Sequence, residues 1–471
     1  MIWNFMKYKD RTALLDDKGE CITYEQLAIE GDTIAERIGH RCLIFALCSN
    51  TLGFVLGYAA CLQHNIVPLL LSSHLDEELL QVLLKEYHPE YIWCPVEHSF
   101  AKQQVDAEKV YESYGYALYE YKTEEHAKLY EELGLLLTTS GSTGSPKLVR
   151  QSYRNIAANA DQIARYLELD ETERPITTLP MNYTYGLSII NSHLLVGATI
   201  LLTEYGLMQK EFWNFLREGK ATSFGGVPYT YEMLEKLRFF RMNLPDLRYM
   251  TQAGGKLSPE LHRKFAEYAR QSGKRFIVMY GQCEATARMS YLPAERSLEK
   301  YGSMGIAIPD GTFSLIDVSG AVIEDAETVG ELVYEGPNVT LGYAEHREDL
   351  ALGDERKGRL ETGDMAKRDA DGFYYIVGRK KRFLKVYGNR VNLDEIDMMV
   401  KNEFGNVDCV TAGKDDHVCI FLTDDSLVDA VRHYIADKTK LNLAAFHVKV
   451  LEEIPKNESG KVQYSELEQY Y

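Results

Sequence analysis

A polar, glycine-containing loop directly after an apolar run is the feature that most restricts the fold of this chain. The segment Leu137-Thr138-Thr139-Ser140-Gly141-Ser142-Thr143-Gly144-Ser145-Pro146-Lys147 holds six hydroxyl side chains, two glycines and one lysine. Glycine lets backbone N–H groups approach an anion, hydroxyls add donors, and the lysine supplies a positive charge. The loop therefore predicts a phosphate site. It is not a Walker loop, because Leu148 follows Lys147 where serine or threonine is required.

Apolar strand-like runs and helical patterns alternate around this loop, which predicts an α/β fold with parallel sheets covered by helices. The expected elements are a strand at 43–46, a helix at 51–63, a strand at 67–71, a helix at 76–87, a strand at 135–138 and a helix at 153–166. Ligands usually bind at the carboxyl ends of the strands in this architecture. The loop leaves the strand at 135–138 at such an end.

The pattern changes after Gly311 to short β runs separated by turn residues. A small antiparallel β-subdomain is expected from runs at 313–317, 330–334, 358–360 and 372–377. A compact α+β unit is expected from a helix at 394–404 and strands at 408–412 and 418–423. We therefore predict an N-terminal domain over residues 1–380, whose β-subdomain covers about 311–380, and a C-terminal domain over 381–471.

Composition argues against several classes of function. The net charge of −18, from 52 basic and 70 acidic residues, argues against binding to nucleic acid or an anionic membrane as the main activity. Eight cysteines without CxxC spacing predict neither a zinc site nor a disulfide framework, and they favour a cytoplasmic protein. No signal peptide is indicated, and polar residues interrupt the most apolar segment, 42–71, so no membrane span is expected.

Four further motifs follow the loop in order. They are Tyr280-Gly281-Gln282-Cys283-Glu284, Glu361-Thr362-Gly363-Asp364, Gly378-Arg379-Lys380-Lys381 and Pro455-Lys456-Asn457-Glu458-Ser459-Gly460-Lys461. Together with the loop, these segments resemble the ordered motifs of the adenylate-forming superfamily, which includes acyl-CoA synthetases, peptide-synthetase adenylation domains and luciferases. The five matches span positions 137 to 461, which is most of the chain.

The resemblance implies an enzyme that uses ATP and Mg²⁺ to activate a small carboxylic acid as an acyl-AMP. The acyl group then passes to a thiol, which is coenzyme A or the phosphopantetheine arm of an acyl carrier protein. Adenylation joins a carboxylate to the α-phosphate while pyrophosphate leaves, so catalysis consists of positioning and charge neutralisation. The C-terminal domain is expected to act as a lid that turns about Lys381 between the two half-reactions.

The resemblance also implies roles for individual residues. The match of Lys461 bridges the incoming carboxylate and the α-phosphate, and the match of Glu284 binds Mg²⁺. Asp364 should accept hydrogen bonds from both ribose hydroxyls, and Tyr280 should stack on adenine. The other residues expected to bind the nucleotide are Thr139, Ser140, Gly141, Ser142, Thr143, Gly144, Lys147, Gly254, Gly255, Gly281, Cys283 and Arg379.

The acid is expected to bind against segments 181–187 and 225–228. Thr184 falls where amino-acid-activating relatives carry an aspartate for the substrate ammonium, and burying an ammonium without that carboxylate is costly. Clustered tyrosines then favour an aryl or medium-chain acid over an amino acid. The residues expected to bind the acid are Tyr183, Thr184, Tyr185, Gly225, Gly226 and Gly305.

Two departures from the family motifs leave alternatives open. Cys283 stands where the family carries a threonine whose hydroxyl donates to phosphate, and a thiol is a weaker donor. Leu148 stands where glycine is usual. These departures motivate one alternative, a weakened homologue that binds nucleotide or acyl ligand without turnover. Independently of them, a second alternative is an acyl-AMP ligase that loads only a carrier protein.

Overall fold

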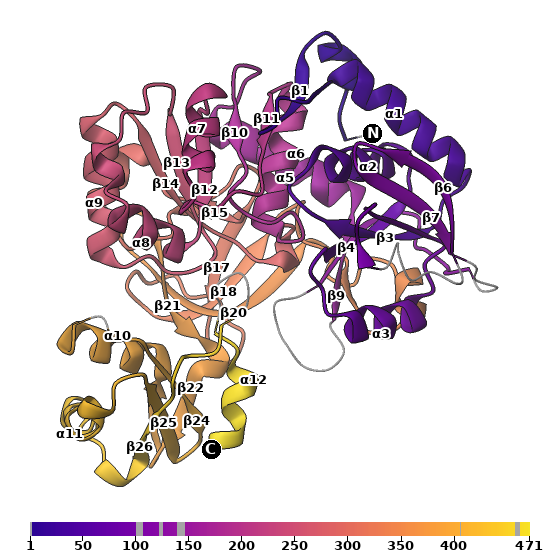
Figure 1. Ribbon diagram of the computed structural model, residues 1–471. Helices are drawn as coiled ribbons and strands as arrows, with labels where there is room; N and C mark the ends of the chain where they lie inside the picture. The colour runs from indigo at the N-terminus through magenta and orange to yellow at the C-terminus, as the bar shows by residue number, and fades with distance from the viewer. Residues whose placement is uncertain (1, 100–106, 122–125, 139–146, 406, 457–461) are drawn as a thin grey trace. The chain divides into compact units, whose positions relative to one another are not determined.

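The chain folds into two compact units (Figure 1). The computed structural model describes residues 2–99, 107–121, 126–138, 147–405, 407–456 and 462–471. The first unit lies within residues 1–139, 145–312 and 335–360, and the second contains 313–334 and 361–471. The strands expected for the β-subdomain thus fall mainly in the same unit as the C-terminal segment. The domain boundary at Lys381 lies inside this second unit and stays a prediction.

The first unit contains two β-sheets. The eight-stranded sheet has, in spatial order, β19 (Gly342–Ala344), β9 (Leu148–Ser152), β8 (Leu133–Thr138), β4 (Val67–Ser72), β3 (Leu43–Cys48), β5 (Tyr91–Pro95), β7 (Tyr116–Tyr121) and β6 (Ala107–Ser113). The nine-stranded sheet has β16 (Ile306–Ala307), β15 (Ser290–Tyr291), β14 (Arg275–Tyr280), β13 (Tyr249–Gln252), β12 (Ser223–Gly226), β10 (Pro175–Ile176), β11 (Ile200–Leu202), β1 (Thr12–Asp16) and β2 (Cys21–Thr23).

Both sheets are mixed, with a parallel centre and antiparallel edges. β4, β3 and β5 run parallel, as do β10 to β14 along the second sheet. Antiparallel pairing at the edges comes from neighbours such as β8 with β9 and β14 with β15. The α/β fold class is confirmed, and the expectation of parallel sheets holds for their centres. Adjacent strands in the sequence pair antiparallel at the edges, because a short connection reverses the chain.

The strand β3 shows how the core is divided. Leu43, Phe45 and Leu47 contribute to one hydrophobic cluster, which also contains residues of α3 (Glu77–Tyr87). The alternate residues of β3 contribute to a second cluster, shared with α2 (Leu52–Gln63) and α6 (Thr184–Val196). A strand buried on both faces reads as a continuous apolar run rather than an alternating one. The sequence of β3 has this form.

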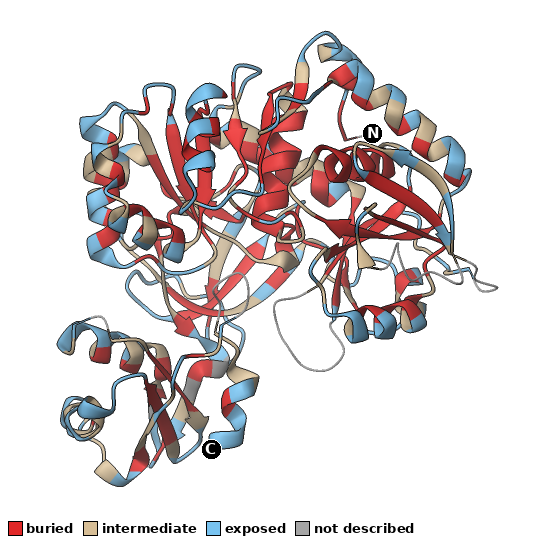
Figure 2. Cartoon of the chain, viewed as in Figure 1, coloured by how far each residue is buried: buried red, intermediate tan, exposed pale blue. Residues whose placement is uncertain are grey.

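Two helices of the first unit are buried nearly all around, whereas the others show one solvent face (Figure 2). α2 and α6 are the buried pair, and α5 (Tyr153–Leu167) packs against α6. Such helices lie inside a layered domain rather than on its surface. Among the described residues, the other α-helices of this unit are α1 (Tyr24–Ile38), α7 (Lys210–Glu218), α8 (Pro228–Lys236) and α9 (Pro259–Gln271).

The second unit combines small sheets with short helices. Its four-stranded sheet has β17 (Thr312–Ile316), β18 (Gly330–Glu335), β20 (Arg359–Arg368) and β21 (Tyr374–Arg379). The C-terminal segment adds a hairpin, β22 (Phe383–Val386) with β23 (Asn389–Asn392), and a sheet of β24 (Cys409–Lys414), β25 (His417–Leu422) and β26 (Phe446–Val450). Its helices are α10 (Leu393–Glu403), α11 (Val428–Thr439) and α12 (Tyr464–Leu467).

One strand differs clearly from the sequence prediction. The run expected at 358–360 is the start of the ten-residue strand β20, so Asp364 lies within a strand. Polar residues and Gly363, whose φ is +68°, concealed this strand in the sequence. Among the described residues, no helix is long and apolar enough to cross a membrane.

Candidate active site

The structure describes only part of the predicted phosphate loop. Thr139, Ser140, Gly141, Ser142, Thr143 and Gly144 lie outside the described residues, as does Lys461. Lys147 is described, immediately before β9. Its Nζ lies 2.5 Å from Glu345 Oε1, and both side chains are more than half exposed. An exposed ion pair of this kind stabilises little, so a phosphate could replace Glu345 as the partner of Lys147 at small cost.

Glu284 is the predicted catalytic residue that belongs to the first unit. It lies in the short 3₁₀ helix η3 (Cys283–Ala285), which follows β14. Its backbone carbonyl accepts hydrogen bonds from Thr340 N, Thr340 Oγ1 and Arg356 Nη1 at 2.9 to 3.1 Å. Its carboxylate accepts a hydrogen bond from the Tyr343 hydroxyl at 2.6 Å. These contacts fix both the backbone and one oxygen of this half-buried side chain.

The surroundings keep Tyr343 a neutral donor to Glu284. Burial, followed by the Glu284 charge, raises the pKa of the Tyr343 hydroxyl, and the Arg356 guanidinium lies 4.6 Å from the centre of its ring. Mg²⁺ prefers oxygen ligands and is often held by one or two carboxylates together with substrate phosphates. A single oriented carboxylate therefore fits the metal role assigned to Glu284.

Cys283 contacts the residue predicted to replace the amino-acid-binding aspartate. Its Sγ lies 3.4 Å from Thr184 Oγ1, at the first residue of α6. Cys283 was assigned to the nucleotide and Thr184 to the acid, so this contact brings the two predicted sites together within the first unit.

The glycines predicted to bind the nucleotide or the acid leave room for neighbouring side chains and backbone atoms. A Cβ on Gly254 would lie 2.4 Å from Tyr183 Oη, and one on Gly225 would lie 2.9 Å from Tyr185 Oη. At Gly281 and Gly305 a Cβ would meet a backbone carbonyl within 2 Å. Gly226 would meet Thr230, and Gly255 would meet Pro228. The two tyrosines therefore reach the carboxyl ends of β12 and β13 because glycines leave room for them.

The aromatic residues expected to bind the acid lie together. The rings of Tyr183 and Tyr185 meet edge to face with centres 6.3 Å apart. The Tyr185 hydroxyl lies 2.8 Å from Thr251 Oγ1, and burial raises the pKa of Tyr185 to about 12. Tyr280 ends β14, and its hydroxyl accepts a hydrogen bond from Gln282 Nε2 at 3.1 Å.

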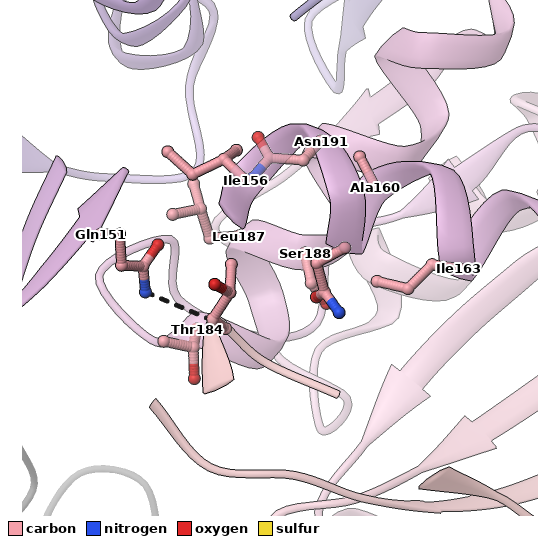
Figure 3. A pocket seen from close by; sticks show the side chains of 10 residues that line it. Gln151, Ile156, Ala160, Ile163, Thr184, Leu187, Ser188 and Asn191 are labelled. Carbon is pink, nitrogen blue, oxygen red and sulfur yellow. Dashed lines mark hydrogen bonds between the residues drawn. The ribbon is translucent and has the colours of Figure 1, made fainter. Parts of the chain in front are cut away.

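A narrow pocket between α5 and α6 contains Thr184 and adds residues around it that the sequence did not indicate (Figure 3). It is lined by Thr184, Leu187, Ser188 and Asn191 of α6, by Ile156, Asn159, Ala160 and Ile163 of α5, and by Gln151 and Thr286. The carbonyl oxygen Oδ1 of Asn159 is buried and has no hydrogen-bond partner among the described residues. A buried acceptor without a partner is uncommon in proteins.

Asp364 and Arg379 face each other within the second unit. They are paired across β20 and β21, and Arg379 Nε lies 3.2 Å from Asp364 Oδ1. Asp364 is only 3 % exposed, whereas the Arg379 side chain is largely exposed. Lys381 lies in the short 3₁₀ helix η6 (Lys380–Arg382) between β21 and β22. The neighbouring Arg382 forms ion pairs with Asp394 and Asp397.

One other group of possible metal ligands occurs in the part of the chain that the structure describes. His40, Cys42 and Glu90 bring their ligand atoms within 4.8 Å of one another. His40 Nε2 lies 2.7 Å from Glu90 Oε2, and His126 Nδ1 lies 3.0 Å from the same oxygen. Direct pairing of the carboxylate with two histidines accounts for this group without an ion.

Two mixed sheets covered by helices, with Glu284 held by Tyr343 just after β14, define an α/β protein with a candidate site after a strand end. The sequence profile of the AMP-binding enzyme family matches residues 3–344, and the chain belongs to this family.

Relatives agree with this assignment. The chain is 27 % identical over 354 residues to an oxalate–CoA ligase of Arabidopsis thaliana, covering 72 % of this chain and 67 % of the relative. It is 25 % identical over 344 residues to a 2-succinylbenzoate–CoA ligase of Listeria monocytogenes, covering 71 % and 69 %.

A solved structure has the same fold over nearly the whole chain. It is the o-succinylbenzoate CoA synthetase of Bacillus subtilis with its acyl-adenylate intermediate, at a TM-score of 0.79 and 20 % identity, covering 98 % of this chain and 97 % of that one. The prediction of an adenylate-forming ligase of the acyl-CoA synthetase type is confirmed. The roles of the individual residues stay predictions.

Proposed function

We propose that this protein joins a carboxylic acid to ATP as an acyl-AMP and then transfers the acyl group to coenzyme A. The observation that carries the proposal is the family match over residues 3–344. Within this range, Tyr343 and Thr340 hydrogen-bond to Glu284, the predicted metal ligand, and Arg356 donates to its backbone carbonyl. The relatives named above are CoA ligases. The Bacillus subtilis enzyme has been solved with its acyl-adenylate and also with ATP and a magnesium ion.

The chemistry has two steps. A carboxylate oxygen attacks the α-phosphorus, and pyrophosphate leaves with the electrons of the broken P–O bond. The thiolate sulfur of the acceptor then attacks the acyl carbon, and AMP leaves. Mg²⁺ would neutralise charge on the phosphates, and the Glu284 carboxylate is the residue that we assign to hold it.

The assignment of Lys461 rests on its motif and can be tested against a lysine nearby. Lys461→Ala should lower acyl-AMP formation by about 10²-fold or more, because it removes one preorganised charge. It should largely spare thioester formation from supplied acyl-AMP. Lys456→Ala is the matched control: Lys456 Nζ lies 2.9 Å from Asp408, and its loss should affect neither step. Acyl-AMP formation by Lys461→Ala at the parental rate would remove the assignment.

The metal role of Glu284 needs a separate experiment. Glu284→Gln should lower pyrophosphate release strongly and weaken its response to Mg²⁺, because an amide is a poorer ligand for a hard cation. Cys283→Thr should preserve or raise the rate, since a hydroxyl is a better donor than a thiol. Pyrophosphate release unchanged by Glu284→Gln across a Mg²⁺ titration would contradict the metal role.

The acceptor and the acid complete the proposed function. We assign coenzyme A as acceptor, and a carrier protein and a cytoplasmic location stay predictions. The acid is proposed to lack an α-ammonium, since Thr184 supplies no carboxylate to pair with one. Acyl hydroxamate formation is measured in the presence of ATP and hydroxylamine for each acid of a panel. A product with any acid shows that the protein is an active ligase. Its absence with every acid would indicate a homologue that binds without turnover.

A further inference from the structure

Arg288 is a buried cation next to the predicted acid site. It lies just before β15 and is 2 % exposed. Guanidinium groups carry a positive charge in proteins, so the burial of Arg288 places such a charge inside the first unit. Burial of an ion without an opposite charge is unfavourable, and buried arginines are therefore normally paired.

The contacts of Arg288 are all to neutral groups. Nε donates to Ser188 Oγ at 3.0 Å, and Nη1 donates to the Tyr166 hydroxyl at 3.0 Å. Nη1 also lies 3.4 Å from Met279 Sδ, and the guanidinium lies 5.2 Å from the centre of the Tyr185 ring. Within the described ranges, no Asp or Glu forms an ion pair with Arg288, and Nη2 makes no hydrogen bond.

A small pocket adjoins this cation. Arg288 lines it together with Gly225, Thr251, Ser223, Tyr249 and His193. Burial, and then the charge of Arg288, lowers the pKa of His193 to about 3, so this histidine is neutral at neutral pH. The nearby buried Glu173 is already engaged, because it lies 3.0 Å from Arg248 Nη1. Arg288 therefore supplies the positive charge of this pocket.

The helix α6 connects Arg288 with the reaction end of the predicted site. Thr184 contacts Cys283, the neighbour of Glu284, and Ser188 holds Arg288 Nε. Both residues line the pocket between α5 and α6 (Figure 3). Residues four apart lie on one helix face, separated by one turn or about 6 Å along the axis. This distance along the helix corresponds to about three to five carbon atoms between the two ends of an extended acid.

We propose that the acid carries a second acidic group and that Arg288 binds this group while the other end is adenylated. The inference rests on the proposed ligase function and narrows its substrate to a short acid with a terminal carboxylate or sulfonate. Binding would give Arg288 its missing counter-ion, and the planar guanidinium suits a carboxylate. Ser188 and Tyr166 are then positioning residues, since they hold Nε and Nη1 and leave Nη2 for the ligand.

The test compares matched acids on the whole enzyme by ATP–pyrophosphate exchange. Glutarate is paired with pentanoate, adipate with hexanoate, and 4-sulfobutanoate with pentanoate. We expect kcat/KM to be about tenfold or more higher for at least one acid with two acidic groups than for its partner. Preference for the carboxylate or for the sulfonate identifies which group is bound. Equal or better use of the acids with one acidic group would overturn the inference.

Variants separate recognition from folding. Arg288→Met should lower kcat/KM for the preferred acid by about 30-fold or more, and change that for its partner with one acidic group much less. Arg288→Lys keeps the charge and should retain part of the preference. Arg165→Met is the control: this arginine on α5 pairs with exposed Asp161 and Asp310, so the preference should stay. An unchanged preference in Arg288→Met would refute the role of Arg288.

The outcomes for the inference and for the proposed function are distinguishable. If no acid of either kind supports exchange or hydroxamate formation, the ligase function fails. If acids with one acidic group support exchange and those with two do not, the function stands and the inference fails. If Arg288→Met does not fold, the inference is decided by whether the parental enzyme prefers acids with two acidic groups.

Discussion

Two buried arginines in the first unit differ in what surrounds their charge. Arg150 on β9 is fully buried, and Arg288 is 2 % exposed. Arg150 donates to the carbonyls of Tyr343, Leu352 and Gly353 and pairs with Glu355 at 2.5 Å. Arg288 has only a serine, a tyrosine and a methionine sulfur as acceptors among the described residues. The two arginines are equally buried, but Arg150 has an acidic partner and three carbonyl acceptors, whereas Arg288 has no acidic partner among the described residues.

The difference separates a charge that stabilises the fold from one that is available to a ligand. Arg150 joins β9 to β19 and to the segment after it, and Gly342 faces it across the strand pair. A Cβ on Gly342 would lie 2.3 Å from Glu355 Oε2 and 2.9 Å from Arg150 Nη2, so the ion pair uses the space that glycine leaves. No comparable ion pair surrounds Arg288 in the described part of the chain.

The largest effect on stability is expected for Arg150. Arg150→Met should lower the free energy of unfolding by about 3 kcal/mol or more, because several hydrogen bonds to a charged group are lost together. Urea denaturation measures the change from the midpoint at an unchanged slope. A loss below about 1 kcal/mol would show that these bonds are weak or replaced by water.

A pH titration tests whether His193, which lines the pocket beside Arg288, is neutral in the folded protein. His193 Nδ1 lies 2.7 Å from the carbonyl of Ile189, and Nε2 lies 3.1 Å from the Tyr249 hydroxyl. The folded pKa of about 3 is below the ordinary value of 6.5, so the unfolded chain alone gains a proton as pH falls below 6.5. Stability is complete above pH 6.5 and falls by about 1.4 kcal/mol per pH unit below it, toward pH 3.

Variants assign this slope to one residue. His193→Gln should reduce the loss of stability between pH 6.5 and 4.5 by about 2–3 kcal/mol. His433→Gln, at an exposed histidine on α11, is the control. Arg288→Met should leave most of the slope, because burial is a larger cause of the His193 pKa shift than the arginine charge. If His193→Gln kept the full dependence of stability on pH, other groups would cause this dependence. One such group is His262, because burial lowers its pKa to about 4.

Much of the fold was predictable because its signals are local. The apolar run of β3 and the following helix are continuous in the sequence, and Asp76 caps α3 at the expected end by accepting from Leu79 N at 3.1 Å. β20 was predicted too short, since strand pairing in the second unit overrides its polar composition. The antiparallel pairing of β19 with β9 joins strands far apart in the sequence, and the alternation of strand and helix patterns does not indicate which distant strands pair.

The candidate site was predictable only where a motif marks it. Glu284 and Asp364 stand in motifs, whereas Tyr343 and Arg356 contact Glu284 from positions about 60 to 70 residues later. Arg288 is a single arginine between Ala287 and Met289, and a single charged residue in a sequence predicts a solvent-exposed side chain. What distinguishes it is the lack of a carboxylate around it, and a sequence cannot report that.

A moderate effect on stability is expected for Arg288 itself. Arg288→Met removes a buried charge that lacks an opposite charge and substitutes a flexible apolar side chain, so stability should change by no more than about 1 kcal/mol in either direction. Urea denaturation of Arg288→Met and Arg150→Met under one condition gives the comparison. Equal, large losses in both variants would make Arg288 a structural residue and remove the contrast.

The smallest effect is expected at the acidic partner of Arg150. Glu355 is 54 % exposed, so water already screens its charge, and Glu355→Gln should cost only about 0.5 kcal/mol. The amide can still accept from Arg150 Nη2, and the three carbonyls that Arg150 contacts remain. Repeating the measurement in 1 M salt should shrink the difference further, because salt screens exposed pairs. A loss of about 3 kcal/mol, equal to that of Arg150→Met, would mean that the ion pair rather than the carbonyl contacts satisfies the buried arginine.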